Sequence, residues 1–373
     1  MKSSLRFITL QPVLVFIFLA LVASCAEKQK NEGDATNASA KIYITALDKS
    51  QLLQEHDVAT KSTTTPAGTI QVDPSTTYQE IDGFGYTLTG GSALHISNMS
   101  APARTALLQE LFGTGTNSIG VSYLRLSVGG SDLDEYPWSY NDLPKGATDV
   151  DLAQFSLAYD TLYLIPVLKE ILKISPELKL MGSPWSPLTI DALTIQNEPL
   201  HPGNNPSLLM LADQQANFIK NDLGPTFKNL GIKTKIIIYD HNADRPDYPI
   251  SILNDVDAAQ YIDGSAFHMY GGEIDALSEV HEAHPTKNLY FTEQWVGAPG
   301  DFAGDVAWHN EVLIIGATRN WSKTVLEWNV AADEHQNPHT DRGGCDRCLG
   351  ALTITGDSVV RNPAYYIIAQ ASK

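Results

Sequence analysis

The sequence has few basic residues, and this shortage narrows the functions that it can serve. Among 373 residues, 25 Lys and Arg stand against 43 Asp and Glu, which gives a formal net charge of −18. So acidic a chain repels phosphate backbones and anionic lipid surfaces. Nucleic acid is therefore not expected as a partner, whereas a neutral ligand such as a carbohydrate is compatible with this charge.

Long apolar runs are also scarce, and the most prominent one lies near the N-terminus. Lys2 and Arg6 precede the run Val13 to Val22, which is too short for an ordinary transmembrane helix. Residues 1–25 resemble a bacterial lipoprotein signal in which Cys25 becomes the lipidated terminus; an ordinary cleaved secretory signal is the alternative. Residues 26–41 are polar and predict a flexible tether. We therefore expect an extracytoplasmic protein, in the periplasm or at the cell surface, anchored to a membrane through Cys25.

Cysteines are equally rare, because only Cys345 and Cys348 follow Cys25. Together with His335 and His339 they match the spacing of zinc ligands. The alternative is a local disulfide, which is common in exported proteins. The export signal favours the disulfide, so neither a metal nor another cofactor is expected.

Beyond residue 77 the chain alternates strand-like and helix-like segments, a pattern typical of a parallel sheet covered by helices. Eight such strands predict an α/β fold, an (α/β)₈ TIM barrel over residues 78–373. The predicted strands are 80–87, 122–128, 178–183, 192–196, 235–240, 264–268, 289–292 and 324–328. The predicted helices are 101–111, 152–174, 206–230, 249–259, 273–284 and 306–321.

Two features depart from a regular barrel. Residues 42–77 carry short strand-like runs at 42–45 and 69–72, which we interpret as strands of a side domain that lack partners. Between the third and fourth barrel strands, only Leu188 to Ile190 remain for the connection. Parallel neighbours need a crossover of about a dozen residues or more, so the third barrel helix is expected to be missing.

Polar side chains gather where the predicted strands end, which is where TIM barrels carry their active sites. Glu198 follows the fourth strand within Asn197-Glu198-Pro199, and Glu293 follows the seventh. Glycoside hydrolysis uses such a carboxyl pair, about 5–5.5 Å apart when the configuration is retained. The histidines His241 and His268 also lie near the mouth, and we assign them no chemistry.

These motifs resemble glycoside hydrolase family 30, which contains glucosylceramidases and bacterial β-1,6-glucanases. The resemblance extends from about Tyr78 to Lys373, and its order and spacing are specific. The matching runs are residues 81–85 (IDGFG), 125–132 (RLSVGGSD), 183–187 (SPWSP), 194–199 (TIQNEP), 267–270 (FHMY), 293–295 (EQW) and 328–329 (WN).

The resemblance implies a role for each matching residue. Glu198 would be the acid/base and Glu293 the nucleophile of a retaining β-glycosidase. Arg125 would keep the nucleophile ionised, and Tyr270 would orient it. Asn197 would bind the sugar 2-hydroxyl. The remaining residues expected to bind the sugar are Asp132, Trp185, Trp295 and Trp328.

Departures from the family pattern bear on substrate and activity. The run Leu88 to Ala93 (LTGGSA) replaces the Thr-Asp-Ala-Ala of glucosylceramidases and resembles the branch associated with β-1,6-glucan. The loop and helix before the fourth strand and the family's C-terminal β-sandwich are not found. The expected function is hydrolysis of β-linked glucosides, with endo-β-1,6-glucan as the substrate. The alternatives are a glucosylceramidase-like β-glucosidase, a vestigial glycan-binding lipoprotein without turnover, and a zinc-binding structural protein.

Overall fold

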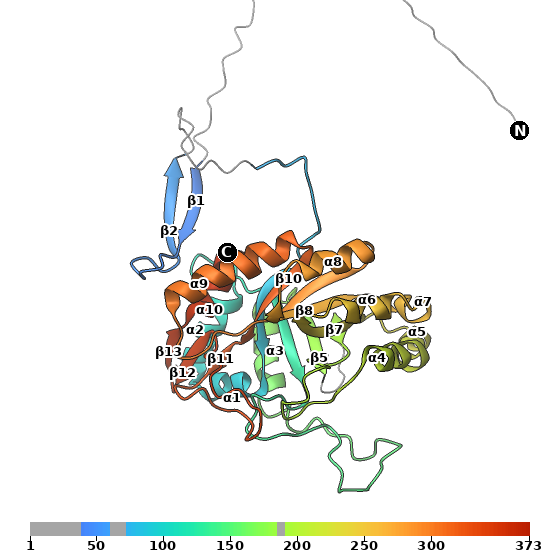
Figure 1. Cartoon of the computed structure of the whole chain (residues 1–373). Coiled ribbons are helices and arrows are strands. Elements are labelled where there is room, and N and C mark those ends of the chain that lie inside the picture. The colour runs from blue at the N-terminus through green and yellow to red at the C-terminus, as the bar shows by residue number, and fades with distance from the viewer. Residues whose placement is uncertain (1–38, 60–71, 185–190) are drawn as a thin grey trace, which may run out of the picture.

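A computed structural model describes residues 39–59, 72–184 and 191–373 of the chain (Figure 1). The predicted signal segment with Cys25, the tether up to residue 38 and Trp185 lie outside these residues. In the described part, no helix combines the length and the apolar character needed to cross a membrane.

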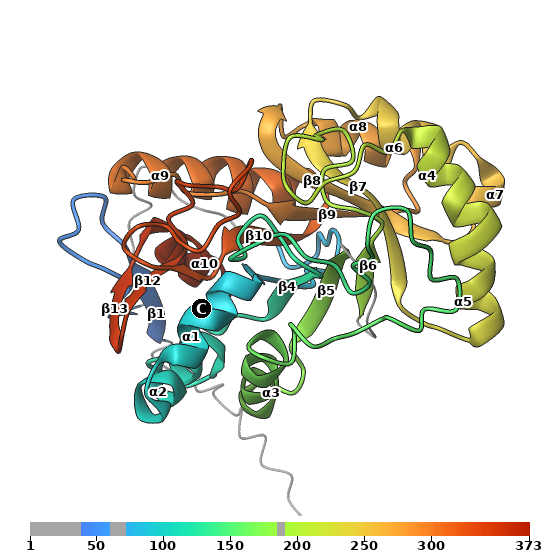
Figure 2. The same ribbon diagram turned by 90° about the horizontal axis from the view of Figure 1, so that it is seen from below.

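Eight parallel strands form a closed barrel, as the sequence predicts, and helices surround them (Figure 2). The strands pair in the order β10-β3-β4-β5-β6-β7-β8-β9. Each predicted strand is present, with ends that differ by a few residues. Their bounds are β3 Gly83–Leu88, β4 Tyr123–Val128, β5 Lys179–Pro184, β6 Ala192–Thr194, β7 Lys235–Ala243, β8 Ile262–Gly272, β9 Asn288–Glu293 and β10 Ser322–Asn329.

Helices cover the outside of the barrel, and most of them match the predictions. Helices at both ends of the barrel sequence, α1 Gly90–Asn98 and α10 Pro363–Ser372, were not predicted. The others are α2 Ala101–Phe112, α3 Leu164–Ile174, α4 Ala212–Phe218, α5 Gly224–Leu230, α6 Asp247–Leu253, α7 Val256–Ala259, α8 Ala276–Ala283 and α9 Phe302–Trp308. The π-helical turns η1 Ile219–Leu223 and η2 His309–Ala317 extend α4 and α9.

The predicted helix 152–174 is wrong in its first half. Residues 152–163 form turns, and α3 begins at Leu164. The carboxylate of Asp149 accepts the backbone N–H groups of Ala153 and Gln154, at 2.9 and 2.6 Å. Such side-chain bonds compete with helical ones, and Leu152 has a left-handed φ of 53°. Leu162, within the predicted helix, is therefore 57% exposed.

The barrel interior changes from apolar to polar along its axis. An apolar layer contains Tyr123, Met181, Ala192, Ile237, Ala266, Tyr290 and Leu326, one residue from each strand except β3. Side chains that point outward, such as Leu124 and Ile238, pack instead against the helices. The apolar layer closes the inside of the barrel. It therefore shields the polar side chains nearer the C-terminal strand ends from water on the side of the layer.

The barrel closes although β5 and β6 are joined by an unusually short segment. Met181 pairs with Ala192, and Gly182 with Leu193. Only residues 185–191 lie between the two strands, which leaves no room for a crossover helix of ordinary length. Leu193 is buried and Leu180 is half-buried. The expectation of a missing third helix therefore agrees with the order of the elements.

The N-terminal strands pair with each other, so the interpretation of them as unpaired was wrong. Strand β1 (Ser39–Ile44) forms an antiparallel sheet with β2 (Gln54–Ala59), and β2 was not predicted. The hairpin contacts the end of α10, where Gln370 donates to the hydroxyl of Thr45 at 2.7 Å. Of the predicted strand 69–72, residues 69–71 lie outside the described part. A third sheet contains β11 (Ala331–Ala332), β12 (Leu352–Thr355) and β13 (Ser358–Arg361).

Candidate active site

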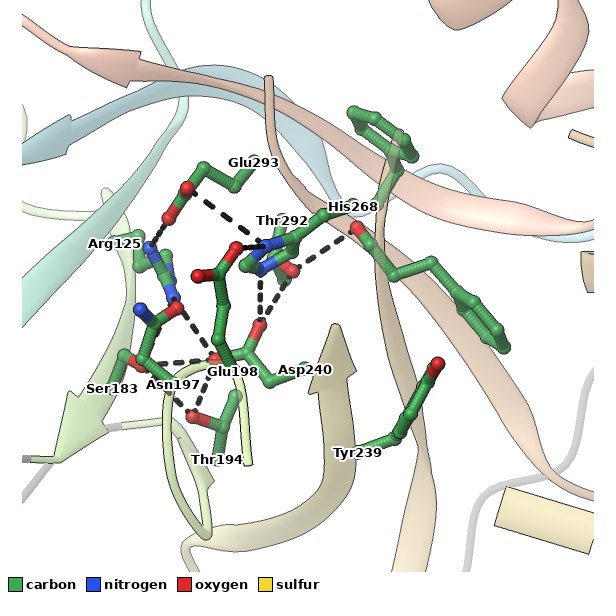
Figure 3. A network of polar contacts seen from close by, with 12 residues as sticks. Arg125, Ser183, Thr194, Asn197, Glu198, Tyr239, Asp240, His268, Thr292 and Glu293 are labelled. Atoms are coloured by element: carbon green, nitrogen blue, oxygen red, sulfur yellow. Dashed lines mark hydrogen bonds and ion pairs between the residues drawn. The ribbon is translucent and has the colours of Figure 1, made fainter. Parts of the chain in front are cut away.

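A fully buried arginine on β4 organises the polar end of the barrel (Figure 3). Nη1 of Arg125 donates to Oε2 of Glu293 at 2.6 Å. Nη2 donates to Oδ1 of Asn197 at 2.7 Å, to the hydroxyl of Ser183 at 3.0 Å and to Oδ2 of Asp240 at 3.0 Å. One guanidinium thus fixes side chains from four further segments, and its charge offsets two buried carboxylates.

An irregularity in β7 places Asp240 inside the barrel. Ile237 faces inward, so strict alternation would also turn Tyr239 inward. Tyr239 and Asp240 instead have left-handed φ values of 73° and 59°, and the pairing with β8 shifts between Tyr239 and His241. Tyr239 therefore packs outside, 5.6 Å from the ring of Phe267, and Asp240 turns inward. Bulges of this kind re-aim side chains next to active sites.

Asp240 collects hydrogen bonds from every side. Its Oδ2 accepts from Arg125, Ser183 and Thr194, and its Oδ1 accepts from Thr292 at 2.7 Å. Nε2 of His268 lies 3.1 Å from the same Oδ1. Burial alone would raise the pKa of Asp240, but the charge of Arg125 and the surrounding donors hold it well below its ordinary range.

His268 connects this buried carboxylate to the site above it. Its Nδ1 lies 3.1 Å from Oε1 of Glu198 and 3.8 Å from Oε1 of Glu293. Burial would lower the pKa of His268, but Glu293, Asp240 and Glu198 together raise it to about 10. The imidazole is therefore a cation at neutral pH and donates from both ring nitrogens.

Glu198 and Glu293 face each other at the ends of β6 and β9. An oxygen of each carboxylate and a ring nitrogen of His268 all lie within 4.8 Å of one another. Retaining glycosidases hold their carboxyl groups about 5–5.5 Å apart, whereas inverting enzymes leave a gap of about 6.5–9.5 Å for a water molecule. This approach fits the spacing of a retaining enzyme better than that of an inverting one.

The two carboxyl groups have different surroundings. Burial raises the pKa of Glu293, while the charges of His268 and Arg125 oppose that rise. Both of its oxygens also receive donors, because the hydroxyl of Tyr270 donates to Oε1 at 3.0 Å. Burial would raise the pKa of Glu198 too, but the hydrogen bond and the charge of His268 lower it below its usual value.

A cavity of about 350 Å³ opens above these carboxylates. Asp132 is buried in its wall, and burial together with the charges of Glu293 and Glu198 raises the pKa of Asp132 to about 8. The guanidinium carbon of Arg125 lies 5.5 Å from the ring centroid of Trp328. The cavity is lined by Asp132, Asn197, Glu198, His201, Asn204, His241, Asn242, Tyr270, Glu293, Trp295, Trp328, Cys345 and Cys348.

The cysteine pair also lies at this cavity, joined as a disulfide between Cys345 and Cys348. The two sulfurs are bonded to each other, so they offer no thiolates to a zinc ion. The disulfide loop is attached to the segment after β9, since Gly297 forms a β-bridge with Cys348. The arrangement supports the disulfide rather than the zinc interpretation.

Within the described residues, Glu198, His268 and Glu293 are the only convergent group that could hold a metal ion. The carboxylates of this group already face the positive charges of Arg125 and His268. A divalent cation would have to displace the proton from His268. The donor set is therefore better suited to proton transfer than to a resident metal.

The structure brings together most of the side chains that the sequence singles out. Of these only Trp185 and Cys25 lie outside the described residues. Sequence reasoning assigned no role to His268, although this residue lies two positions before Tyr270 at a strand end. It also missed the inward polar residues that hold Asp240 in place, namely Ser183, Thr194 and Thr292.

Comparison with known proteins identifies the family of the chain. The model of the glycosyl hydrolase family 30 TIM-barrel domain matches residues 81–192 and 187–373, two segments that meet between β5 and β6. The endo-1,6-beta-D-glucanase of Neurospora crassa is 30% identical in an alignment that covers 89% of this chain and 79% of that protein. The lysosomal acid glucosylceramidase of Mus musculus is 24% identical over 368 residues, with coverages of 82% and 70%.

The solved structure of an endo-beta1,6-glucanase superposes with a TM-score of 0.81 at 32% identity. The alignment covers 88% of this chain and 83% of that one. A match of the family model to most of the chain and a relative at this identity both show the family of the chain. The chain belongs to glycosyl hydrolase family 30 and is an O-glycosyl hydrolase.

Proposed function

We propose that this chain is a retaining β-glycosidase that cleaves β-1,6-linked glucan, with Glu293 as the nucleophile and Glu198 as the acid/base. The observation that carries the proposal is the approach of the two carboxylates, with oxygens within 4.8 Å of each other at the ends of β9 and β6. This spacing suits a mechanism with two successive displacements.

In the first step, an oxygen of Glu293 forms a bond to the anomeric carbon while the glycosidic bond breaks. Glu198 gives a proton to the leaving oxygen, and a glycosyl-enzyme ester remains. In the second step, a water molecule attacks the same carbon and gives its proton to Glu198, and the ester bond to Glu293 breaks. The anomeric configuration is inverted twice and therefore retained.

The partners of the carboxylates fit these roles. The charge of Arg125 and the hydroxyl of Tyr270 stabilise Glu293 in its ionised form for attack. Arg125 engages Oδ1 of Asn197, which leaves the amide N–H₂ of Asn197 for a sugar hydroxyl. A raised pKa keeps Asp132 protonated near neutral pH, so that it can donate to a second hydroxyl.

His268 supplies the proton that Glu198 needs. In the free site the proton resides on Nδ1 of the imidazole, 3.1 Å from Oε1 of Glu198. A bound glycosidic oxygen offers an acceptor next to Glu198, so the proton moves from His268 to Glu198 and on to the leaving group. Nε2 keeps its hydrogen bond to Asp240 throughout, which holds the ring in position.

The substrate proposal follows from the relatives, which include endo-1,6-beta-glucanases that are 30% and 32% identical to this chain. A glucosylceramidase-like β-glucosidase is the second candidate, supported by the mouse relative. A vestigial glycan-binding protein is the third, because the short β5–β6 connection departs from a regular barrel.

Incubation with β-1,6-, β-1,3- and β-1,4-glucan and with an aryl β-glucoside separates these candidates. We expect reducing ends from the β-1,6-glucan, with the β-anomer of the new end appearing first in proton NMR spectra. Hydrolysis of the aryl β-glucoside without cleavage of any polymer would favour the β-glucosidase. Saturable binding without product would favour the vestigial protein.

We further propose that Cys25 carries a lipid that anchors the protein to a membrane on the extracytoplasmic side. The support is the basic, apolar and small-residue pattern of residues 1–25. Labelling of the expressed protein with a radioactive fatty acid, followed by membrane fractionation, tests this. Label and membrane association should be lost in Cys25→Ala, and a label that persists in this variant would exclude the anchor.

A further inference from the structure

A second cavity, of about 220 Å³, lies between the first turns of α1 and α3, which are neighbours in Figure 2. The loop between β4 and α3, residues 129–163, forms much of its wall. It shares no lining residue with the catalytic cavity. Its side walls are mainly aromatic and acidic, and they include Tyr136, Trp138, Tyr159, Tyr163, Asp134 and Asp160.

Three aromatic rings form a continuous cluster along one wall, with Tyr136 edge to face against Tyr159 and Trp138 tilted by 38° against it. The ring centroids of Trp138 and Tyr159 lie 4.8 Å apart, and those of Tyr159 and Tyr136 lie 5.7 Å apart. Trp138 is buried, whereas Tyr159 and Tyr136 are 40% and 46% exposed. Aromatic side chains that are fixed at one end and open at the other suit a ligand with an apolar face and polar edges.

Two carboxylates complete the cavity. Asp160 is 3% exposed, and its Oδ2 accepts from the hydroxyl of Tyr140. None of the described residues donates a hydrogen bond to its Oδ1. Oδ2 of Asp134 accepts from the backbone N–H and the hydroxyl of Ser131, at 2.6 and 3.0 Å. Hydrogen-bond acceptors beside aromatic rings are what the hydroxyl groups of a sugar need.

A glycine makes room for one of these carboxylates. A Cβ atom at position 90 would lie 1.9 Å from Oδ1 of Asp134. Only a glycine at position 90 therefore leaves space for the Asp134 carboxylate where it lies. Gly90 belongs to the Gly-Gly run that distinguishes this chain from the glucosylceramidase pattern. The cavity and this sequence difference are therefore physically linked.

The two cavities border on the same two loops. Asp132 lines the catalytic cavity, and Asp134 lines the second one. Pro338 reaches the second cavity from the loop that carries the disulfide, and the N–H of Thr340 donates to the carbonyl of Asp132 at 2.8 Å. A polymer held at the carboxylates could thus reach the second cavity without leaving the protein surface.

We propose that this cavity is an accessory subsite that binds a distal glucosyl unit of the β-1,6-linked chain cleaved at Glu198 and Glu293. The inference rests on the proposed function. It assigns the sugar's ring face to the aromatic cluster of Tyr136, Trp138 and Tyr159, and its hydroxyl groups to Asp134 and Asp160.

Tyr159→Ala tests the subsite through substrate length. We expect kcat/KM on β-1,6-glucan to fall about five- to tenfold, mainly through KM, and kcat/KM on an aryl β-glucoside to stay unchanged. Tyr159→Phe keeps the ring and should retain the wild-type value on both substrates. Tyr78→Ala, at an exposed tyrosine that precedes β3, is the control. An equal loss on both substrates, or no loss on either, would overturn the proposal.

A binding measurement separates failure of this inference from failure of the proposed function. In the Glu293→Ala background, calorimetric titration with β-1,6-linked gluco-oligosaccharides should give a Kd that rises about five- to tenfold on adding Tyr159→Ala. Hydrogen exchange in residues 131–163 should slow on binding. If wild-type protein cleaves no glucan but this difference in Kd persists, the subsite stands without the activity. Equal Kd values for Glu293→Ala and for the double variant Glu293→Ala/Tyr159→Ala would overturn the subsite, whether or not the wild-type enzyme turns over.

Discussion

Nδ1 of His268 lies 3.1 Å from Oε1 of Glu198, so the carboxyl group proposed as the acid/base shares a hydrogen bond with a buried imidazole. The other ring nitrogen lies 3.1 Å from Asp240, whose carboxylate is held ionised by Arg125. This chain of contacts fixes the orientation of the imidazole and raises its proton affinity. The acidity of Glu198 thus depends on residues two contacts away from the sugar.

The pH dependence of stability reports on this imidazole. The pKa of His268 is raised to about 10 in the folded protein, against about 6.5 in an unfolded chain. Its contribution to stability is therefore fully present below about pH 6.5 and is lost as the pH rises to about 10. We expect the free energy of unfolding to fall in this window by a few kcal/mol, on the order given by linkage.

Urea unfolding between pH 6 and pH 10 measures this slope. It should be shallower in His268→Gln and unchanged in the control His335→Gln, whose imidazole is exposed. NMR titration should place the midpoint of His268 near the raised value in wild type and closer to 6.5 in Asp240→Asn. A His268 midpoint near 6.5 in the wild-type protein would refute the assignment of the proton to the imidazole.

Removal of the nucleophile should abolish turnover. Glu293→Ala leaves no group to attack the anomeric carbon, so activity on every substrate should disappear. Added azide can occupy the vacated space and attack in its place, which should restore cleavage of an activated aryl glucoside and give the α-glycosyl azide. Product analysis by NMR identifies that anomer. Glu282→Ala, on the exposed face of α8, should behave as wild type, and a β-glycosyl azide would discard the assignment.

The loss of activity on removing Glu198, the proposed acid, should depend on the leaving group. Glu198→Ala lacks the proton donor, which contributes about 10²–10⁴-fold where the leaving oxygen is basic. Cleavage of β-1,6-glucan should therefore fall within that range, whereas activated aryl glucosides should lose less. The ratio of kcat values on the two substrates measures the effect. The opposite pattern, with Glu293→Ala sparing activated substrates, would exchange the two roles.

The sequence predicts the barrel well because strand alternation with helices is a local pattern. All eight strands were found, since short apolar runs between helical segments specify both the element and its burial. The first half of helix 152–174 was not foreseen as turns, because the competing bonds to Asp149 depend on a side chain outside the periodic pattern. The pairing of β1 with β2 was missed for a similar reason, because Gln54–Ala59 has little apolar content.

The two carboxylates of the candidate site were predictable from the sequence. The residues that hold them in place were less so. Glu198 and Glu293 stand in recognisable motifs at strand ends. The inward turn of Asp240 depends on the bulge at Tyr239, which alternation places on the wrong side. The bridging position of His268 depends in turn on Asp240. Long-range geometry of this kind has no counterpart in local sequence.

Opening the disulfide should weaken substrate binding more than the chemical step. Cys345 and Cys348 line the catalytic cavity and pack with Trp295 and Trp328. The double variant Cys345→Ser/Cys348→Ser frees a loop that borders the sugar site, so we expect KM to rise several-fold with a smaller change in kcat. Steady-state kinetics with and without reductant measure this in the wild-type protein. If reductant still raised KM in the double variant, the effect of reductant would not come from this disulfide.

The short connection between β5 and β6 should limit stability. A parallel sheet is usually covered on both faces. On the outer face of these strands Leu193 is buried, but Leu180 is only half-buried. A large apolar side chain that a helix would bury contributes about 1.5–3 kcal/mol, which is a noticeable part of a domain stability of about 5–15 kcal/mol. We therefore expect the chain to have low stability and weak activity. Insertion of a family-like loop and helix between Pro187 and Asp191 should raise the midpoint of the circular dichroism melt, while a scrambled insert of equal length should not. A sharp melt of the unmodified chain above about 50 °C, a temperature typical of stable mesophilic domains, together with efficient glucan hydrolysis, would show that these strands need no such cover.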